Sequence, residues 1–366
     1  MNGSRNPLAT IQIQGRSEIW GDLVKASAEI SEFDANQASD ADLADYHRLV
    51  LASSALDKPD QPPMDRATAV GDLQNPPAAY RPPRYWAAHA AGRLVGFARV
   101  GFLGAENTHL GITEIMVHPE FRRRRIGTGL LATVVSALRA DGRRLIQGWA
   151  VPQGGAGALW AASLGFRQVH SAVSQRLVFA EVDSSIWEVD TPPGYRLERW
   201  IGAAPEKLVT SYAHAKGAIL DLPGWDLMGY QIPDWTAGRV RQEEAHLREM
   251  GIETRVVVAV SEETGAVAGI TELMLYPHNS DQARQGDTAV LAEHRGHGLG
   301  RCMKARMVRW VVADKPRLKW IITSSATTNS QMIRVNHQIG YRTVRNIVTV
   351  EHDVATLESE LQNRKP

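Results

Sequence analysis

The sequence is short of several features that large classes of proteins need. Its 366 residues include one cysteine, Cys302, so no internal disulfide can form, which is typical of a protein kept in a reducing compartment. No apolar run is long enough to cross a bilayer, and the first residues lack the apolar core of a signal peptide. We therefore expect a cytoplasmic protein that has no membrane partner.

The chain also has little excess charge of either sign. Its 41 Lys and Arg residues against 40 Asp and Glu residues give a net charge of +1, which argues against a nucleic-acid partner held by phosphate neutralisation. No spacing of His, Cys, Asp and Glu is typical of a metal site, so no metal is expected. With 43% apolar residues, the length suits two ordinary domains.

One stretch of the sequence occurs twice. Residues 117–131 and 290–304 each end a strand-like run, supply a turn rich in Arg or Gly, and begin an amphipathic helix. Gly127 and Gly300 lie 173 positions apart, and the later Gly165 and Gly340 lie 175 apart. Two landmarks at nearly one offset, in a chain about twice as long, indicate that one domain fold is used twice.

We place an N-terminal domain at 1–182 and a C-terminal domain at 183–366. In each, apolar patterns predict an α/β fold with a central mixed sheet and helices on both faces. The predicted strands are 84–91, 94–103, 109–117, 144–151 and 173–182 in the first copy and 195–200, 254–261, 266–275, 286–290, 320–325 and 342–350 in the second. The main helices are predicted from the turns to about residues 140 and 313.

A family resemblance rests on the second turn. Arg295-Gly-His-Gly-Leu-Gly300 fits the signature Arg/Gln-x-x-Gly-x-Gly/Ala, and the neighbouring strand and helix and the later Asn329 and Gly340-Tyr341 follow in the order of the GNAT acyltransferase superfamily. The chain resembles a tandem GNAT protein, similar in layout to mycothiol synthase and related actinobacterial acetyltransferases. The resemblance implies an N-acyltransferase that uses acyl-CoA, with acetyl-CoA the expected donor, and a primary amine of a small molecule as the acceptor in a ternary complex.

The second copy has the more regular cofactor turn. Backbone N–H groups at a glycine-rich helix N-terminus form a site for phosphate, and small residues let the phosphate approach. The resemblance further implies a backbone donor to the thioester carbonyl at a bulge near Ala289 and Val290. The full C-terminal set is Ala289, Val290, Arg295, Gly296, His297, Gly298, Gly300 and Asn329.

The first copy departs from the signature. In the register anchored by Pro119-Glu120, Arg125 stands where the first signature glycine is expected. A second register, starting at Arg124, satisfies the letters but moves the turn two residues into the helix. An Arg can still donate its backbone N–H there if its φ is not left-handed. The N-terminal set is Met116, Val117, Arg122, Arg124, Arg125, Gly127 and Thr128.

Two strand carboxylates are candidate general bases. Glu114 and Asp287 each lie eight residues before the signature arginine of their copy. Carboxylates are depleted in strands, and one whose pKa is raised in a partly apolar cleft could deprotonate an ammonium. The alternative is a solvated or ion-paired strand residue. His109 is an alternative base, although such a histidine is more often a structural hydrogen-bonder.

Two features leave rival functions open. Where the family often carries a tyrosine that protonates the leaving thiolate, this chain has Ala161 and Asn336. A catalytically impaired acetyl-CoA-binding protein or regulator is therefore an alternative. A protein lysine acetyltransferase would need an open acceptor groove. The aromatic insert at 222–235 either forms an acceptor wall, which favours an enclosed small-molecule pocket, or packs between the domains.

Overall fold

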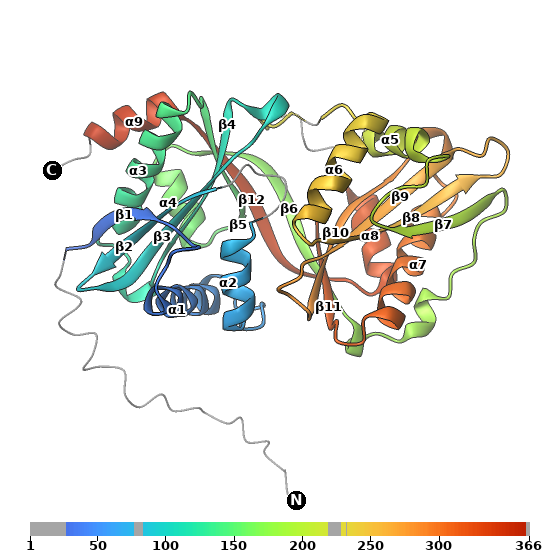
Figure 1. Cartoon of the computed structure of the whole chain (residues 1–366), viewed down its shortest axis with the longest axis horizontal. Coiled ribbons are helices and arrows are strands. Elements are labelled where there is room, and N and C mark those ends of the chain that lie inside the picture. The colour runs from blue at the N-terminus through green and yellow to red at the C-terminus, as the bar shows by residue number, and fades with distance from the viewer. Residues whose placement is uncertain (1–26, 77–82, 219–227, 232, 364–366) are drawn as a thin grey trace, which may run out of the picture.

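The computed structural model of the chain describes residues 27–76, 83–218, 228–231 and 233–363 (Figure 1). Its strands pair into a single mixed sheet, which runs through both halves of the molecule. The strands are β1 (Glu29–Phe33), β2 (Arg84–Ala90), β3 (Arg93–Phe102), β4 (Leu110–Val117), β5 (Leu145–Pro152), β6 (Arg167–Val178), β7 (Tyr195–Ile201), β8 (Glu253–Ser261), β9 (Val267–Leu275), β10 (Gln282–Val290), β11 (Trp320–Ala326) and β12 (Arg342–Asp353).

The sheet has the order β1-β2-β3-β4-β5-β12-β6-β11-β10-β9-β8-β7. The order reads as two matching halves that meet at the antiparallel pair of β12 and β6. β12 pairs with β5 of the first half, and β6 pairs with β11 of the second half. Each half is therefore completed by a strand from the other.

The predicted strands agree with the described ones to within a few residues, but their partners differ. The repeat predicts 173–182 as the last strand of the first copy and 342–350 as the last strand of the second. In the structure these two strands have changed places. Copies of one fold have edges of the same shape, so the strand pattern cannot say which copy a closing strand joins. The α/β class is confirmed, with the two sheets fused into one.

In the first half, α3 covers one face of the sheet and α1 and α2 cover the other (Figure 1). The cluster around α3 also contains Val354, Leu357 and Leu361 of the C-terminal helix α9, which returns to this half. The helices are α1 (Asp40–Asp57), α2 (Arg66–Gln74), α3 (Ile126–Ala140), α4 (Ala156–Ser163) and α9 (Val354–Asn363).

The second half repeats this arrangement. α7 packs on the face formed by Val257, Ala259 and Ala283, and α5 packs on the opposite face with Val256 and Val258. Alternate residues of β8 thus contribute to two cores, as the two-residue period of a strand requires. The helices are α5 (Val209–Gly217), α6 (Ala237–Glu249), α7 (Leu299–Asp314) and α8 (Ser330–Ile339).

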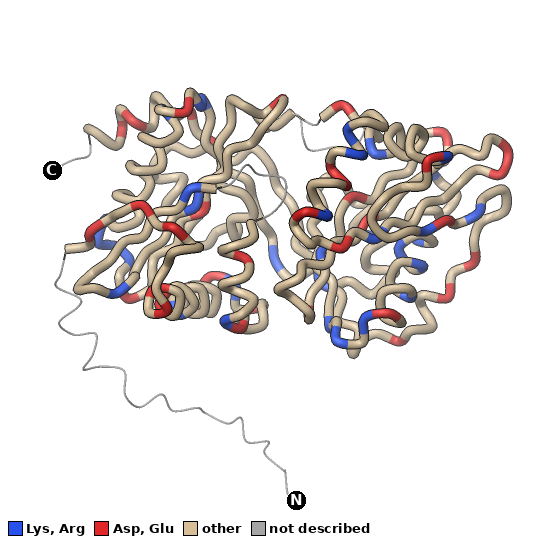
Figure 2. The backbone as a smooth tube through the Cα atoms, viewed as in Figure 1, with Lys and Arg blue, Asp and Glu red and all other residues tan. Residues whose placement is uncertain are grey.

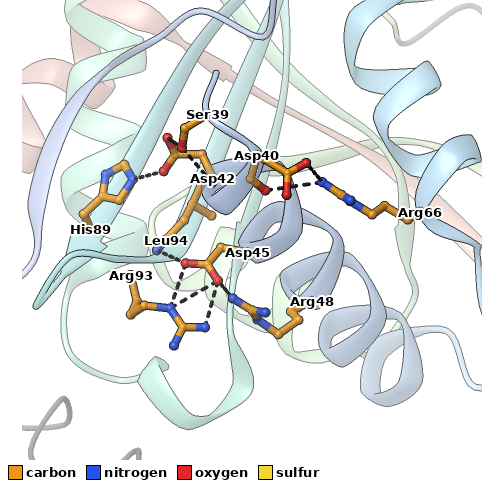
Figure 3. A network of polar contacts seen from close by, with 9 residues as sticks. All are labelled: Ser39, Asp40, Asp42, Asp45, Arg48, Arg66, His89, Arg93 and Leu94. Carbon is orange, nitrogen blue, oxygen red and sulfur yellow. Dashed lines mark hydrogen bonds and ion pairs between the residues drawn. The ribbon is translucent and has the colours of Figure 1, made fainter. Parts of the chain in front are cut away.

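A buried carboxylate holds α1 on the sheet of the first half (Figure 3). Asp45 is 5% exposed and accepts hydrogen bonds from Arg93 Nε, at 2.9 Å, and from the backbone N–H of Leu94 at the start of β3. Arg48 on the same helix also pairs with Asp45. Satisfying a buried charge from two elements fixes the helix against the β2–β3 hairpin.

Polar contacts between the halves form at two corresponding places. His278, in the loop between β9 and β10, contacts Asp72 of α2 at 2.5 Å. Glu106, in the loop between β3 and β4, pairs with Arg239 of α6 at 2.5 Å. In each case the hairpin of one half reaches a helix that covers the sheet of the other half. The halves therefore share side-chain contacts as well as strands.

Candidate active site

Two turns with one backbone shape begin the main helices of the halves. In the second half Gly296 and Gly298 have φ angles of 86° and 78°, and Gly298 directly precedes α7. In the first half Arg123 and Arg125 have φ angles of 65° and 63°, and Arg125 directly precedes α3. The turns therefore correspond residue by residue at the offset of 173, in the register anchored by Pro119-Glu120.

The left-handed arginines differ from the expectation for the first turn. Arg125 was expected to replace glycine only if its φ lay outside the left-handed region. The structure instead shows Arg125 in the left-handed conformation. Such a conformation costs a residue with a Cβ about 1–2 kcal/mol. Strain of this kind clusters at functional sites. The first turn keeps the shape that glycine adopts easily, although two of its positions are arginine.

The helix N-terminus in each turn is open to a ligand. No side chain of the described residues caps α3 or α7. The first amides of a helix have no intrahelical acceptor and carry partial positive charge. A Cβ built on Gly296, Gly298 or Gly300 would meet no atom within 4 Å. The second turn thus fits a phosphate group, because its amides are uncapped and the space beside its glycines is open.

Each signature arginine bonds its turn to the end of the preceding strand. Arg122 Nε donates to the carbonyl of Val117 at 3.0 Å, and Arg295 Nε donates to the carbonyl of Val290 at the same distance. Arg122 also donates to both carboxylate oxygens of Asp57, at 2.9 and 2.6 Å. The Arg124 guanidinium lies over the ring of Phe121. Arg122 therefore ties the turn to the strand before it and to α1.

The parallel strands beside each turn are paired over part of their length. The register of β4 with β5 ends at Thr113 and Gly148, and that of β10 with β11 ends at Arg284 and Ile322. Met116 and Val117 lie beyond the first of these limits, and Ala289 and Val290 lie beyond the second. Their backbone groups are therefore not part of the parallel ladder.

The bulge lies earlier than the resemblance implies. The register of β10 with β9 shifts between Gln285 and Thr288, so that Gly286 and Asp287 together face Glu272. Two residues opposite one are the mark of a β-bulge, which redirects side chains. The pairing of β3 with β4 has no such shift. The second half alone has a bulge at its candidate base, among the described registers.

In the first half, the candidate base is ion-paired. Glu114 accepts a hydrogen bond from Arg99 of β3, directly opposite on the neighbouring strand, at 2.8 Å. Burial raises the pKa of Glu114, but the charges of Arg99 and Lys58 and the hydrogen bond outweigh it and lower the pKa. The side chain is 43% exposed. Glu114 is therefore an accessible carboxylate that is stabilised in its ionised, weakly basic form.

In the second half, the candidate base has the opposite environment. Asp287 lies at the bulge, and burial, assisted by the negative charge of Glu272, raises its pKa to about 6 against the opposing effect of Lys216. No described residue forms an ion pair with Asp287. A carboxylate with these properties is ionised at neutral pH and still accepts a proton readily.

A buried lysine sits beside this carboxylate. Lys216 of α5 donates to Glu272 Oε1 at 2.7 Å and lies 3.4 Å from Glu243 Oε2 of α6. Its Nζ is 4.2 Å from the ring centroid of Trp235. Burial lowers the pKa of Lys216, but the charges of Glu272, Glu243 and Asp287 outweigh it and raise the pKa above its ordinary value. The lysine therefore stays protonated and pairs with Glu272.

The sequence analysis missed Glu272 and its partners. Glu272 is a carboxylate inside the apolar strand β9, so the depletion of carboxylates in strands applies to it too, although it lacks the spacing that selected Glu114 and Asp287. The hydroxyl of Tyr212 also donates to Glu272. No sequence pattern marks Lys216 or Tyr212 as a site residue. Both lie more than fifty residues before Glu272, and only the packing of α5 on the sheet brings them into contact with it.

Four other expected site residues lie in a helix cap, in a turn or in the first turn of a helix. Asn329 caps α8 by accepting from the backbone N–H of Met332 at 3.0 Å. His297 Nδ1 lies 3.2 Å from the carbonyl of His294, within the turn. Gly127 and Thr128 are the second and third residues of α3, and a Cβ on Gly127 would meet the Trp160 ring at 3.6 Å.

The positions of the missing tyrosine are filled by core side chains. Asn336 is fully buried and donates to Gln175 Oε1 at 2.8 Å, which links α8 to the exchanged strand β6. Ala161 is also buried, in a cluster with Val348 and Val350 of the exchanged strand β12. Both positions therefore pack each copy against the strand of the other, and neither side chain can supply a proton.

The aromatic insert forms contacts between the two halves, which is one of the two roles considered for it. Tyr230 packs edge-on against Trp149 of β5, and the backbone of Gly229 and Gln231 bonds to the first half, including His109 Nε2 at 2.7 Å. His109 is thus an interface hydrogen-bonder. Trp235 lies over Lys216 near the candidate base. Trp225 lies outside the described residues.

The described part of the chain shows neither a metal site nor a membrane-spanning helix. Within residues 27–76, 83–218, 228–231 and 233–363, no three or more His, Cys, Asp or Glu side chains are grouped so that they could hold a metal ion. No described helix has the length and apolar character needed to cross a membrane.

Comparisons with known proteins agree with this geometry. Residues 51–166 match the model of the acetyltransferase (GNAT) family. A tandem GNAT protein from the clavulanic acid biosynthesis pathway is 26% identical, with a TM-score of 0.71 over 90% of this chain and 99% of that one. A GCN5-related N-acetyltransferase from Sphaerobacter thermophilus is 15% identical, with a TM-score of 0.66 over 89% and 96%. The curated proteins gave no match.

These findings define the class of the protein. The family match falls on the first copy. Over most of its length the chain has the fold of a tandem GNAT protein.

Proposed function

We propose that the chain is an acyl-CoA-dependent N-acyltransferase that transfers an acetyl group to a primary amine of a small molecule in a ternary complex. One observation carries the proposal. In the second half the bulge with Asp287, the strand end at Ala289 and Val290 beyond the parallel pairing with β11, and the uncapped turn before α7 follow each other within twelve residues. One segment of the chain would thus supply a base, a carbonyl donor and a phosphate site.

The residues divide the work as follows. The amides at the start of α7 would hold the pyrophosphate of acetyl-CoA, which supplies the activated acyl group. Asp287 would accept a proton from the bound ammonium, and the amine nitrogen then forms its bond to the carbonyl carbon while the carbon–sulfur bond breaks. As the carbon–sulfur bond breaks, the nitrogen loses its second proton to water and the departing thiolate takes a proton from water, since Asn336 and Ala161 cannot donate one.

Asp287 suits this role better than Glu114. A general base works best when its pKa lies near the working pH, and Asp287 has a pKa of about 6. Glu114 is held in its ionised form by Arg99, which weakens it as a base. We therefore assign the first proton transfer to Asp287 and give Glu114 a smaller role. Glu272 would raise the pKa of Asp287, and Lys216 would limit that rise.

A regulator that binds acetyl-CoA without turnover is the second candidate. The buried Ala161 and Asn336 favour it, because both copies lack the usual acid. Release of CoA in the presence of a panel of small amines distinguishes the two functions. A protein lysine acetyltransferase is less favoured, since it would need an open acceptor groove and Lys216 and Tyr212 near the candidate base are buried. We also propose a cytoplasmic location and retain 1–182 and 183–366 as the duplicated units.

The cofactor assignment is tested by Gly298→Glu. The new carboxylate would repel phosphate at the open turn, and a left-handed φ is unfavourable for it, so calorimetry should show one acetyl-CoA equivalent fewer per chain. Gly265→Glu is the matched control, because Gly265 has a φ of 72° and open space but lies in the distant β8–β9 hairpin. Unchanged stoichiometry in Gly298→Glu would contradict the assignment.

A further inference from the structure

A cavity of about 290 Å³ lies on the outer flank of the second half, away from Asp287. Its walls are the connection 187–191, the start of β7 from Tyr195, and the side chains of Arg306 and Arg309 on α7. An adjoining cavity of about 240 Å³ shares both arginines and adds Arg199 and Trp310. The two form one seam between α7 and β7, the last strand of the sheet.

The seam has an excess of positive charge. No carboxylate of the described residues forms an ion pair with Arg306 or Arg309. Arg199 lies over the Trp310 ring at 4.7 Å. The acid of the second cavity, Asp314, is paired with Arg255 at 3.0 Å. Figure 2 shows the basic segments along α7 in this half.

Three further acidic groups limit this excess without removing it. Glu198 pairs with Arg196 at 3.0 Å, at the start of β7. Glu188 and Asp190 both lie in the connection 187–191. The three positive charges of Arg199, Arg306 and Arg309 exceed the two carboxylates of Glu188 and Asp190.

The first half shows why this seam is open. The segment after β12 is helix α9, which covers α3 with Val354, Leu357 and Leu361. The corresponding segment after β6 forms only the short turn 184–187, which packs on α7. At the offset of 173, Arg306 and Arg309 correspond to the small residues Thr133 and Ser136. A helix therefore fills the flank of the first half, and an arginine-lined cavity takes its place in the second.

We propose that this seam binds a small phosphorylated molecule. Its phosphate would lie between Arg306 and Arg309, whose planar guanidinium groups each offer two parallel donors to phosphate oxygens. Val189 and Leu197 supply apolar walls for the rest of the molecule. Tyr195 connects the cavity to the cofactor turn, because its hydroxyl lies 2.9 Å from His294 Nδ1. A ligand here therefore contacts a residue that holds the turn.

Calorimetric titration of the full chain with inorganic pyrophosphate, in the presence of saturating CoA, tests the proposal. Arg306→Ala/Arg309→Ala should weaken binding about tenfold or more, because it removes charge-assisted hydrogen bonds. Arg317→Ala/Arg334→Ala removes the same charge from exposed positions elsewhere and should bind as the wild type does. Equal weakening in both double variants would show a general charge effect and would overturn the proposal.

Two further variants separate the seam from the cofactor turn and from unfolding. Under saturating CoA, the Gly298→Glu variant should bind pyrophosphate as strongly as the wild type does. Loss of all such binding in Gly298→Glu would place the ligand at the turn and overturn the proposal. Arg306→Lys keeps the charge but loses the planar fork, so it should weaken binding without changing the melting temperature. Binding of wild-type strength in both Arg306→Lys and the double alanine variant would also overturn it.

Discussion

The two halves place opposite charges beside their strand carboxylates. Glu114 and Asp287 correspond at the offset of 173, and so do their neighbours Arg99 and Glu272 on the preceding strand. Arg99 lowers the pKa of Glu114, whereas Glu272, together with burial, raises that of Asp287 to about 6. One reversal of charge at an equivalent position therefore changes a stabilised carboxylate into one suited to accept protons.

The two copies thus share a backbone conformation at the turns but differ in the chemistry around their strand carboxylates. Both turns have the same left-handed positions, although arginine replaces glycine in one of them. The bulge and the enclosed Lys216 occur in the second half, whereas the family match falls on the first. Family likeness and suitability of the base thus point to different halves, which the following experiments can resolve.

The largest expected effect is loss of folding when the halves are separated. Residues 1–182 alone lack β12 and α9, and 183–366 alone lack β6, so each would expose an unpaired sheet edge and an open core. Both fragments should aggregate, and coexpression should restore soluble protein. As a control, the full chain cleaved at a protease site inserted near Gly194 should stay associated. Two soluble fragments that melt as high as the parent would contradict this.

The next effect concerns turnover. Asp287→Asn should lower the acyl-transfer rate by about 10²–10⁴-fold while acetyl-CoA binding changes little, because a general base acts in the transition state. The pH–rate profile of the wild type should have an acidic limb near pH 6, and the variant should lose it. Glu114→Gln is the matched variant and should cost less. A larger loss in Glu114→Gln would make the first half the catalytic one.

Stability should respond to the same two variants with opposite signs. The raised pKa of Asp287 means that its ionisation opposes folding, so Asp287→Asn should raise the melting temperature at pH 7.5. That gain should disappear as the pH falls below about 6 towards the ordinary range of the carboxyl. The lowered pKa of Glu114 stabilises the folded state, so Glu114→Gln should lower the melting temperature at pH 7.5, and the difference should vanish in acid. Shifts of one sign in both would refute the contrast.

The smallest effect tests the turns. Arg125→Gly removes a left-handed arginine and should stabilise the protein by about 1 kcal/mol in chemical unfolding, after the greater chain entropy of glycine is subtracted. The reciprocal Gly298→Ala places a Cβ at the matching position and should destabilise by a similar amount. Destabilisation by Arg125→Gly would show that the arginine side chain, and not the backbone, holds the first turn.

Much of the fold could be predicted because it depends on local patterns. The alternation of apolar residues marks most strands to within a few positions, and Gly298 marks the start of α7 because few other residues adopt its φ cheaply. The left-handed Arg125 could not be predicted from residue type. The conformation of Arg125 follows only from the repeat, which aligns Arg125 with the left-handed Gly298 of the second turn.

The candidate site was less accessible to prediction. Asp287 was found because it is a strand carboxylate eight residues before the signature arginine, and Glu272, a strand carboxylate without that spacing, was passed over. Lys216 and Trp235 come from a helix and an insert that no motif connects to the strand. Their meeting depends on how α5 packs over the sheet, and the sign of the pKa shift at Asp287 depends on that meeting.

The sequence by itself determined that one α/β unit occurs twice, and where the turns, the main helices and the strand carboxylates lie, because each of these is written in neighbouring residues. The tertiary structure alone decided that β6 and β12 change places and which charges surround each carboxylate. Strand edges of duplicated units are interchangeable, and electrostatic effects depend on distance through space. Neither property is a function of position along the chain.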